Sequence, residues 1–405
     1  MTESVAVYPF PAVPPDRAVE LIQQVIADRP MSKMTMPFGG DVWVIHRYHA
    51  AKQVLENPVF VRGPFARNER EIPYFVQFPD FLKQTFQFAD PPDHTRLRKL
   101  VAKGFTARRV NKLREGTLLI AEDLLDKMTA KGASANLHED FSLPLPIQVI
   151  SELLGVPLSD RDKFVAWSKS TLATSGMTEE EVLQAGAELY MYLAELIAAR
   201  RAEPHDDLLS VLAAAEDADE TLTDAEILPI AMLLIVGGFD NTANFINTAV
   251  LALLRNPDQL KQLLADIDAV VGTTVEEVLR HGTFAVGQPV AGGNGLPPWI
   301  ASEDVELDGQ VVKKGEAVLI DPGCANHDPA MFADAGTFDV TRKSNLHLTF
   351  SHGLHHCIGA PLARMEMQVA LSSLFRRFPA LQLAGEPEYA TEYLTAGMKL
   401  LPVTW

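Results

Sequence analysis

The sequence contains few cysteines and no excess of positive charge. Two cysteines, Cys324 and Cys357, occur in 405 residues, too few for a disulfide framework and typical of a protein kept in a reducing compartment. The formal net charge of −18 at pH 7 argues against a nucleic-acid-binding protein, for which a basic balance is expected. Together these deficits favour a cytoplasmic protein without disulfides and without a nucleic-acid partner.

The sequence also lacks a hydrophobic run long enough to cross a membrane. Its most apolar stretch, 227–239, has 13 residues, whereas a spanning helix needs about 20. Prolines and charges in residues 1–17 are unlike a signal peptide or an anchor. No Ser/Gly tract, repeat or low-complexity segment marks a linker. We therefore expect a single domain over residues 1–405, a monomer, and no membrane association.

Apolar residues recur at helical spacing over most of the chain. The predicted helices cover 16–29, a segment beginning near 93, 111–131, 144–155, 160–174, 179–202, 206–215, 223–254, 273–281 and 360–378. Alternating or turn-rich patterns occupy shorter stretches near 36–48, 285–320 and 381–404. The pattern predicts a mainly α fold with a smaller β region (α+β).

The predicted helix over 223–254 carries the sequence GGFDNTAN at its middle. Adjacent glycines, Gly237 and Gly238, each weaken a helix by about 1 kcal/mol. Two interpretations are open: a flat or bulky group packs against the bare backbone, or other helices stabilise a kink. Asp240, Asn241 and Thr242 follow directly, and buried polar groups in such a helix need partners or a wet groove.

A loop with the sequence FSHGLHHCIG, Phe350–Gly359, places Cys357 just before the helix predicted from residue 360. The free N–H groups and dipole of a helix N-terminus favour a thiolate. The pattern by itself leaves two roles for Cys357, a nucleophile or a metal ligand. Cys324 stands in no motif, and a buried free thiol is expected there.

Several motifs in order resemble the cytochrome P450 superfamily, specifically the soluble bacterial type, over roughly residues 35–404. The Cys357 loop resembles the pattern FxxGxxxCxG. An ExxR pair, a meander, a glycine-paired long helix and an HxxxR helix accompany it. The residues that carry the resemblance are Phe350, Gly353, Cys357, Gly359, Glu277, Arg280, Phe338, Asp339, Arg342, Gly237, Gly238, Asp240, His94 and Arg98.

The resemblance implies a haem-thiolate monooxygenase with haem b (iron protoporphyrin IX), whose iron is bound by Cys357. It implies that His94, Arg98 and His355 bind the haem propionates. It further implies that Glu277, Arg280 and Arg342 form a buried structural network. The loop residues Phe350, Gly353 and Gly359 would then contact the haem from one side, and Gly237 and Gly238 would form the oxygen groove.

Three positions depart from the family pattern. Asn241 stands where a threonine usually follows the acid, here Asp240. Three readings stay open: Asn241 orders a proton-relaying water, Thr242 substitutes after a helix adjustment, or substrate hydroxyls assist. Trp299 stands where relatives usually carry a propionate-binding arginine, which predicts a more apolar haem edge. Ser351 replaces a common glycine, and we expect it to be tolerated.

The resemblance also implies a lipophilic small-molecule substrate that is oxidised with O2, with successive oxidations possible. Electrons would come from NAD(P)H through ferredoxin reductase and ferredoxin. The basic stretch 96–114 is the expected ferredoxin-docking surface. A macrolide or other polyketide is favoured, with a terpenoid second and a catalytically silent haem-binding or sensor protein as a different-class alternative. Predicted substrate contacts are Phe86, Phe88, Leu172, Leu234, Phe239, Phe284, Val286 and Thr395.

Overall fold

The computed structural model describes residues 6–7, 15–74, 80–171, 177–217, 220–282, 297–389 and 397–405. The chain forms two compact units, each assembled from separate stretches of sequence. Unit 1 contains residues 1–83, 87–90 and 276–357, and unit 2 contains 84–86, 91–275 and 358–405. Neither unit is therefore a contiguous stretch of sequence.

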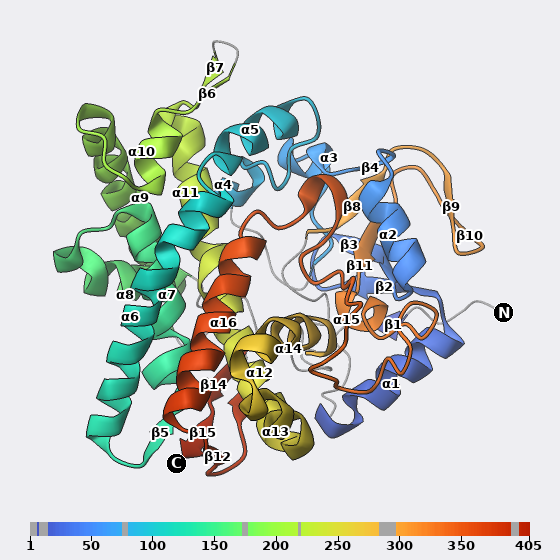
Figure 1. Cartoon of the computed structure of the whole chain (residues 1–405). Helices are drawn as coiled ribbons and strands as arrows, with labels where there is room; N and C mark the ends of the chain where they lie inside the picture. The colour runs from blue at the N-terminus through green and yellow to red at the C-terminus, as the bar shows by residue number, and fades with distance from the viewer. Residues whose placement is uncertain are drawn as a thin grey trace. The chain divides into compact units, whose positions relative to one another are not determined.

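Unit 1 contains a six-stranded sheet with the order β1-β2-β3-β11-β8-β4. The strands are β1 Ala6–Val7, β2 Met31–Met36, β3 Gly40–Ile45, β4 Phe60–Val61, β8 Trp299–Ala301 and β11 Ala317–Ile320. Strand β3 lies in the stretch 36–48, where the sequence predicted an alternating or turn-rich pattern, and it pairs antiparallel with β2 to form a hairpin. At the centre of the sheet, β3 lies next to β11 (Figure 1). These two strands run parallel, with Ile45 opposite Ile320.

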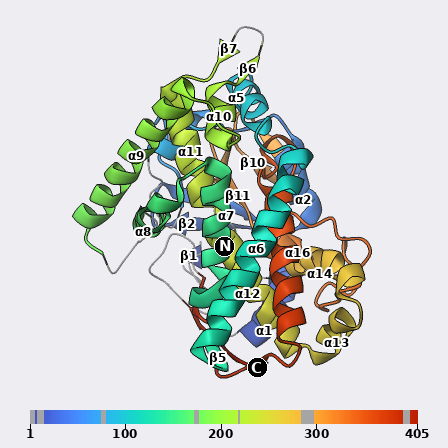
Figure 2. The same cartoon turned by 60° about the vertical axis from the view of Figure 1, so that its left-hand side comes forward.

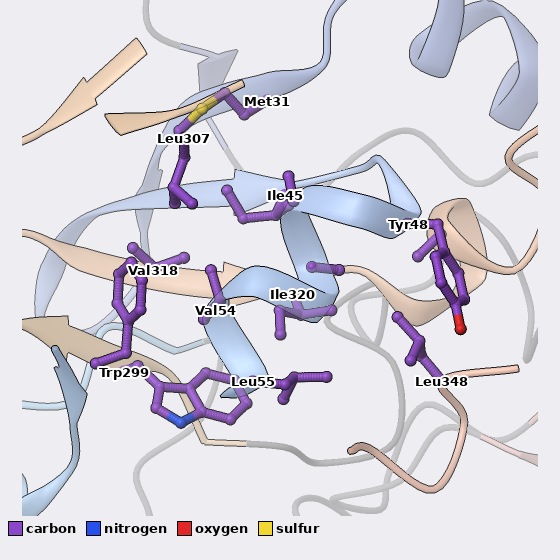
Figure 3. Close-up of a cluster of buried hydrophobic side chains, with 14 of the residues drawn as sticks. Met31, Ile45, Tyr48, Val54, Leu55, Trp299, Leu307, Val318, Ile320 and Leu348 are labelled. Atoms are coloured by element: carbon purple, nitrogen blue, oxygen red, sulfur yellow. The ribbon is translucent and has the colours of Figure 1, made fainter. Parts of the chain in front are cut away.

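The core of unit 1 lies against this sheet. Helix α2 (Tyr48–Glu56) contributes Val54 and Leu55 to a cluster that also contains Ile45, Ile320 and Trp299. Figure 3 shows these side chains gathered between the helix and the strands. Burial of such apolar side chains contributes about 1.5–3 kcal/mol each relative to exposure, so the cluster holds the central strands together.

The other described elements of unit 1 are short, apart from the first helix. They are α1 Pro15–Asp28, α3 Gly63–Ala66, α4 Asp80–Lys83, the hairpin of β9 Val305–Leu307 with β10 Gln310–Val312, α15 Pro322–Ala325 and the single turn η3 Gly353–His355. Helix α14 (Ile267–His281) begins in unit 2 and ends in unit 1. Helix α1 matches the helix predicted over 16–29, and the β9–β10 hairpin lies in the described part of the stretch predicted as alternating or turn-rich near 285–320.

Unit 2 is built mainly from helices, and three long helices pack together. Helix α16 (Ala360–Arg377) runs beside α6 (Ala107–Lys131) and α12 (Asp240–Arg255), as Figure 2 shows. The remaining helical elements are α5 Asp93–Ala102, η1 His138–Ser142, α7 Pro144–Leu154, η2 Leu158–Asp160, α8 Arg161–Thr171, α9 Glu179–Ala202, α10 Leu208–Ala213, α11 Asp224–Gly238 and α13 Pro257–Ala265. Helices are present at each predicted place in this region, although several ends are shifted and the helix predicted over 223–254 is divided in two.

The strands of unit 2 form small sheets. Strands β12 Gln382–Leu383, β15 Pro402–Thr404 and β5 Ser134–Asn136 form one sheet. Two pairs complete the set: β13 Glu388–Tyr389 with β14 Met398–Leu400, and β6 Glu216–Asp217 with β7 Glu220–Thr221. The strand-like pattern predicted near 381–404 is therefore confirmed for 381–389 and 397–404, and residues 390–396 lie outside the described residues.

The prediction of one uninterrupted helix over 223–254 was wrong in one respect. The helix is interrupted at Phe239 and forms two consecutive helices, α11 and α12. The interruption directly follows Gly237 and Gly238, two adjacent residues with low helix propensity. By length and composition alone the combined segment could cross a membrane, but 56% of its most apolar window is buried within the protein. Such burial is typical of a core helix.

Candidate functional site

Cys357 ends a loop that folds back on itself before α16. Its backbone N–H donates to the carbonyl of Phe350 at 2.8 Å, and the His356 N–H donates to the Gly353 carbonyl at 3.1 Å. The Phe350 side chain is buried, whereas Cys357 is exposed within the described residues. Helix α16 begins three residues later, with Gly359 at its N-cap. The fold thus presents the sulfur outward from a fixed backbone.

Two residues of this loop have left-handed backbone conformations. Gly353 has φ +66°, and a Cβ at this position would lie 2.5 Å from the carbonyl oxygen of Leu55. Ser351 has φ +60° and is buried. Glycine adopts positive φ without the steric cost that a side chain incurs. Ser351 is therefore held in a backbone conformation that favours glycine.

Beside the loop lies a fully buried carboxylate, Glu277 on α14. Arg280 binds both of its oxygens, Nε to Oε2 at 2.9 Å and Nη2 to Oε1 at 2.7 Å. Arg342 Nε donates to Oε2 at 3.1 Å, and Asn345 Nδ2 donates to the same atom at 3.0 Å. The Asp339 N–H completes the set at 2.9 Å from Oε1. Sequence reasoning missed Asn345, which belongs to no part of the quoted motif.

Arg280 uses all five of its N–H donors. The three not bound to Glu277 go to the carbonyls of Asn326 at 3.0 Å, Ala335 at 2.8 Å and Thr337 at 3.0 Å. A guanidinium has five N–H donors in a fixed plane, so Arg280 has no N–H group left for another hydrogen bond. The predicted set Glu277, Arg280 and Arg342 is thus brought together, and it fixes the backbone of the meander.

Asn326 connects the Glu277–Arg280 network to the residues that precede the cysteine loop by hydrogen bonds. Its carbonyl accepts from Arg280, while its side chain accepts from the Leu348 N–H at 2.7 Å and donates to the Thr349 hydroxyl at 2.8 Å. Thr349 directly precedes Phe350, whose carbonyl holds the N–H of Cys357. No sequence signal marked Asn326, because its partners are distant in the chain.

Trp299, the second departure from the family pattern, stacks on a buried arginine. The guanidinium carbon of Arg62 lies 3.9 Å from the centroid of the Trp299 ring. Arg62 also donates to the carbonyls of Gln87 at 3.0 Å and Pro297 at 2.8 Å. Burial lowers the pKa of Arg62 to about 9, although the nearby carboxylate of Asp90 opposes this shift. An indole face stabilises a desolvated cation by about 2 kcal/mol.

The paired glycines of α11 have different surroundings. A Cβ at Gly237 would meet no described atom within 4 Å, whereas one at Gly238 would lie 3.1 Å from Cδ1 of Ile150. Gly238 therefore allows α7 to pack closely against α11, and Gly237 leaves open space beside the backbone. The predicted oxygen-groove role suits the surroundings of Gly237 better than those of Gly238.

The polar residues after the interruption lie in the first turn of α12. Asp240 is partly buried, and desolvation raises its pKa to about 7. Asn244 Nδ2 donates to Asp240 Oδ2 at 3.4 Å, and Asn244 Oδ1 accepts from the Met398 N–H at 3.2 Å. Thr242 is buried and its hydroxyl is directed back to the Gly238 carbonyl at 3.4 Å. Asn241 keeps a partly exposed position.

Helix α5 carries the predicted pair His94 and Arg98. The His94 side chain is buried, and the guanidinium carbon of Arg98 lies 6.0 Å from the centroid of Phe86. In unit 1, His355 lies in η3 with a partly exposed side chain. The assignment of these three residues to haem propionates remains a prediction.

The predicted substrate contacts fall into two sets. The side chains of Phe86, Phe88, Leu234 and Phe239 are buried within the described structure. Leu172, Phe284, Val286 and Thr395 lie outside the described residues. Burial fits a core position as well as a binding position, so the substrate role of the first set remains a prediction.

The basic stretch 96–114 is partly neutralised by acids within unit 2. Arg96 pairs with Glu226, and both Arg109 and Lys112 pair with Asp206. The side chains of Lys99, Lys103, Arg108 and Arg114 are exposed along α5 and the start of α6. Exposed cationic side chains are therefore concentrated in this stretch of a chain that is acidic overall.

Comparison with known proteins identifies the family. The cytochrome P450 family model matches residues 163–280 and 295–394. The chain is 42% identical over 381 residues to mycinamicin IV hydroxylase/epoxidase of Micromonospora griseorubida, covering 93% of this chain and 92% of the relative. It is 41% identical over 385 residues to nocardicin C N-oxygenase of Nocardia uniformis subsp. tsuyamanensis, covering 94% and 93%.

A solved structure shows the same fold. The LnmA cytochrome P450 hydroxylase from the leinamycin biosynthetic pathway of Streptomyces atroolivaceus S-140 matches with a TM-score of 0.88 and 37% identity. The match covers 99% of this chain and 100% of that chain. With the cysteine loop and the buried Glu277–Arg280 pair on one fold, these similarities show that the chain belongs to the cytochrome P450 family.

Proposed function

We propose that this cytochrome P450 monooxygenase oxidises a macrolide or related polyketide, using O2 and electrons that NAD(P)H supplies through ferredoxin reductase and ferredoxin. The similarity to mycinamicin IV hydroxylase/epoxidase over more than nine-tenths of both chains carries this proposal. The second relative is named for a different substrate, nocardicin C, so the family leaves the substrate class to be tested.

The residues present fit a haem. In unit 1, Cys357 supplies an exposed thiol on a loop with a fixed backbone. Within unit 2, taken by itself, a Cβ at Gly237 would meet no described atom within 4 Å, which suits a helix backbone that a flat group approaches. A haem whose iron is bound by a cysteine thiolate supplies O–O cleavage chemistry when bound. We assign Cys357 as the ligand, supported by Phe350, Gly353 and Gly359.

The propionate carboxylates would be bound by His94, Arg98 and His355. Two carboxylates in an apolar slot need cationic or hydrogen-bonding partners, and all three side chains can donate. Trp299 presents its ring to Arg62, so the position that usually carries arginine supplies no cation here. The other three residues therefore carry more of the anchoring.

Proton delivery would start at Asp240. A carboxyl group whose pKa lies near the working pH both takes up and releases protons efficiently, and the pKa of Asp240 is about 7. The Thr242 hydroxyl donates to the backbone, which favours the reading in which Asn241 orders a proton-relaying water. Asn241→Ala should then raise the hydrogen peroxide released per NAD(P)H consumed, whereas Thr242→Val should change it much less. Unchanged coupling in Asn241→Ala would reject this reading.

The substrate class can be tested with the purified, haem-loaded protein. Binding of macrolides, linear polyketides and terpenoids should be compared by displacement of the haem's water ligand. Ligands that bind should then be incubated with ferredoxin, ferredoxin reductase, NAD(P)H and isotopically labelled O2. We expect one labelled oxygen per oxidation in a macrolide or polyketide product. Turnover of terpenoids alone would reject the proposed class, and binding without any product would favour a sensor.

The ferredoxin surface is proposed to be the exposed cations of α5 and the start of α6. Charge reversal at Lys99 and Arg108 should raise the KM for ferredoxin several-fold, with a smaller effect at high salt because surface charges are screened. Lys261, exposed on α13, offers a matched control for charge reversal. An equal effect of Lys261→Glu would assign the change to total charge instead of a local surface.

A further inference from the structure

Three side chains of types that can bind a metal ion, His46, Asp321 and Cys324, lie close together at the end of the central strands of unit 1. Strands β3 and β11 are parallel with Ile45 opposite Ile320, so the next residues, His46 and Asp321, lie side by side at the carboxyl edge. The Asp321 N–H donates to the Ile45 carbonyl at 3.0 Å, which extends the ladder to this point. The short helix α15 then brings Cys324 to the same place. The topology thus joins residues that are 275 positions apart.

The three ligand atoms have a spacing that suits one ion. His46 Nδ1 lies 3.7 Å from Asp321 Oδ2, and these atoms and Cys324 Sγ all lie within 4.8 Å of one another. Two ligands about 2.1 Å from a tetrahedral ion are about 3.4 Å apart. Side-chain movements of less than about 1.5 Å would bring all three atoms to such distances.

His46 gives an independent indication that something occupies this point. Its side chain is 2% exposed, and Nε2 lies 3.1 Å from the Ser32 hydroxyl. The other ring nitrogen, Nδ1, is buried without a hydrogen-bond partner among the described residues, and it faces the Asp321 carboxylate. A buried ring nitrogen normally has a partner. A metal-binding histidine commonly has its other nitrogen held by an outer group, as Ser32 does here.

The remaining two side chains are held in place by the fold. Asp321 is the N-cap of α15, and its Oδ1 accepts from the Cys324 N–H at 3.0 Å, which leaves Oδ2 directed to His46. Cys324 is buried against Ile22 and Ile26 of α1. The Asp321 side chain keeps 15% of its surface exposed, so water can reach the group from that side.

We propose that His46 Nδ1, Asp321 Oδ2 and Cys324 Sγ bind one zinc ion, with water as the fourth ligand. A mixed nitrogen, sulfur and carboxylate set in tetrahedral spacing suits zinc, whereas magnesium and calcium require oxygen ligands. Burial, and then the charge of Asp321, raise the pKa of the Cys324 thiol. Zinc binding would therefore release the thiol proton to solvent as the Zn–S bond forms.

The ion would serve a structural role. It would join the ends of β3 and β11 to α15, which directly precedes Asn326. Asn326 in turn holds Leu348 and Thr349 beside the cysteine loop. The zinc site is thus proposed as a support for that loop, outside the catalytic residues, and it stands whether or not the proposed substrate class is right.

Zinc binding should be measured on untagged, haem-loaded protein by competition with a chelating indicator. We expect one zinc per chain, and at least about a 100-fold loss of affinity in Cys324→Ser and His46→Gln, since loss of even an outer-shell partner costs 10–100-fold. Asp321→Asn, which keeps the N-cap, should also weaken binding. His49→Asn, at an exposed position on α2, should not. Absence of zinc binding, or equal affinity in Cys324→Ser and wild type, would overturn the proposal.

Zinc X-ray absorption gives a test that does not depend on variants that may not fold. The wild-type protein should show one sulfur at about 2.3 Å and nitrogen or oxygen ligands at about 2.0–2.1 Å. The sequence has two cysteines, so the same sulfur signal in Cys357→Ser would assign it to Cys324. A zinc ion without sulfur would be an adventitious ion only, and would overturn the proposal, as would a sulfur signal that disappears in Cys357→Ser.

Discussion

The guanidinium of Arg62 stacks on the indole of Trp299, 3.9 Å from the ring centroid. Both side chains are buried. The sequence resemblance led us to expect an arginine at the position of Trp299. The tryptophan therefore has a structural partner of its own. The replacement of arginine by tryptophan thus removes a cation and also provides an aromatic ring that packs on Arg62.

Reversion of this position to the family residue should be harmful. Trp299→Arg would place a second guanidinium beside Arg62, whose pKa is already lowered to about 9 by burial. We expect a loss of about 3 kcal/mol or more in the free energy of unfolding, because an unpaired charge would be buried. Trp299→Phe, which keeps an aromatic face, should lose about 1 kcal/mol. Urea unfolding checks both, and a wild-type stability for Trp299→Arg would refute this account.

Removal of the charge on Glu277 should destabilise the protein strongly. Glu277→Gln keeps the shape but leaves Arg280 and Arg342 buried or partly buried without their counter-ion. A loss of about 3–5 kcal/mol is expected. Asp268→Asn breaks the exposed pair with Arg376 and should cost less than about 1 kcal/mol. Similar losses in the two variants would mean that the buried network adds no special stability.

Two substitutions in the cysteine loop, one to glycine and one from glycine, should change stability in opposite directions. Ser351→Gly should stabilise the protein by about 1 kcal/mol, because the left-handed backbone at φ +60° disfavours a side chain. Gly353→Ala should destabilise it by more, since the new Cβ would collide with the Leu55 carbonyl. The midpoints of thermal unfolding measure both changes. Stabilisation by Gly353→Ala, or destabilisation by Ser351→Gly, would contradict the assigned backbone geometry.

The raised pKa of Asp240 predicts a pH dependence of stability. The ordinary pKa of aspartate is about 3.9, and that of folded Asp240 is about 7. Between these values the folded protein holds a proton that the unfolded chain has lost, so stability falls as the pH rises through this window. Asp240→Asn does not titrate, so its stability relative to wild type should rise from about pH 5 to about pH 8. Asp123→Asn, at an exposed position, should show no such trend, and a flat difference for Asp240→Asn would reject the shift.

Helices could be predicted from the sequence because they depend on nearby residues. The cysteine loop was found as well, since its motif is contiguous and runs into α16. The interruption at Phe239 was missed: adjacent glycines indicate weakness, but whether a helix breaks depends on what packs against it. A Cβ at Gly238 would contact the side chain of Ile150, whereas a Cβ at Gly237 would contact no described atom. The sequence does not distinguish these two environments.

Contacts between distant segments could not be predicted where the residues lie outside the family motifs. Asn326 and Asn345 bind partners on other segments, and a lone asparagine carries no signal of such a role. Cys324 was expected to be a buried free thiol, and the structure confirms that it is buried and free of a disulfide. Its proximity to His46 follows from the pairing of β3 with β11, which requires the fold.

The central claim is that Cys357 binds the haem iron as a thiolate, and the absorption spectrum of the reduced, carbon monoxide-bound protein tests it most directly. Wild-type protein should show the strongly red-shifted main band of a thiolate-ligated haem. Cys357→His should retain haem but show the band of an imidazole-ligated one, and Cys324→Ser should keep the wild-type spectrum. A wild-type protein with the imidazole-type band, or a Cys357→His variant with the thiolate-type band, would contradict the account.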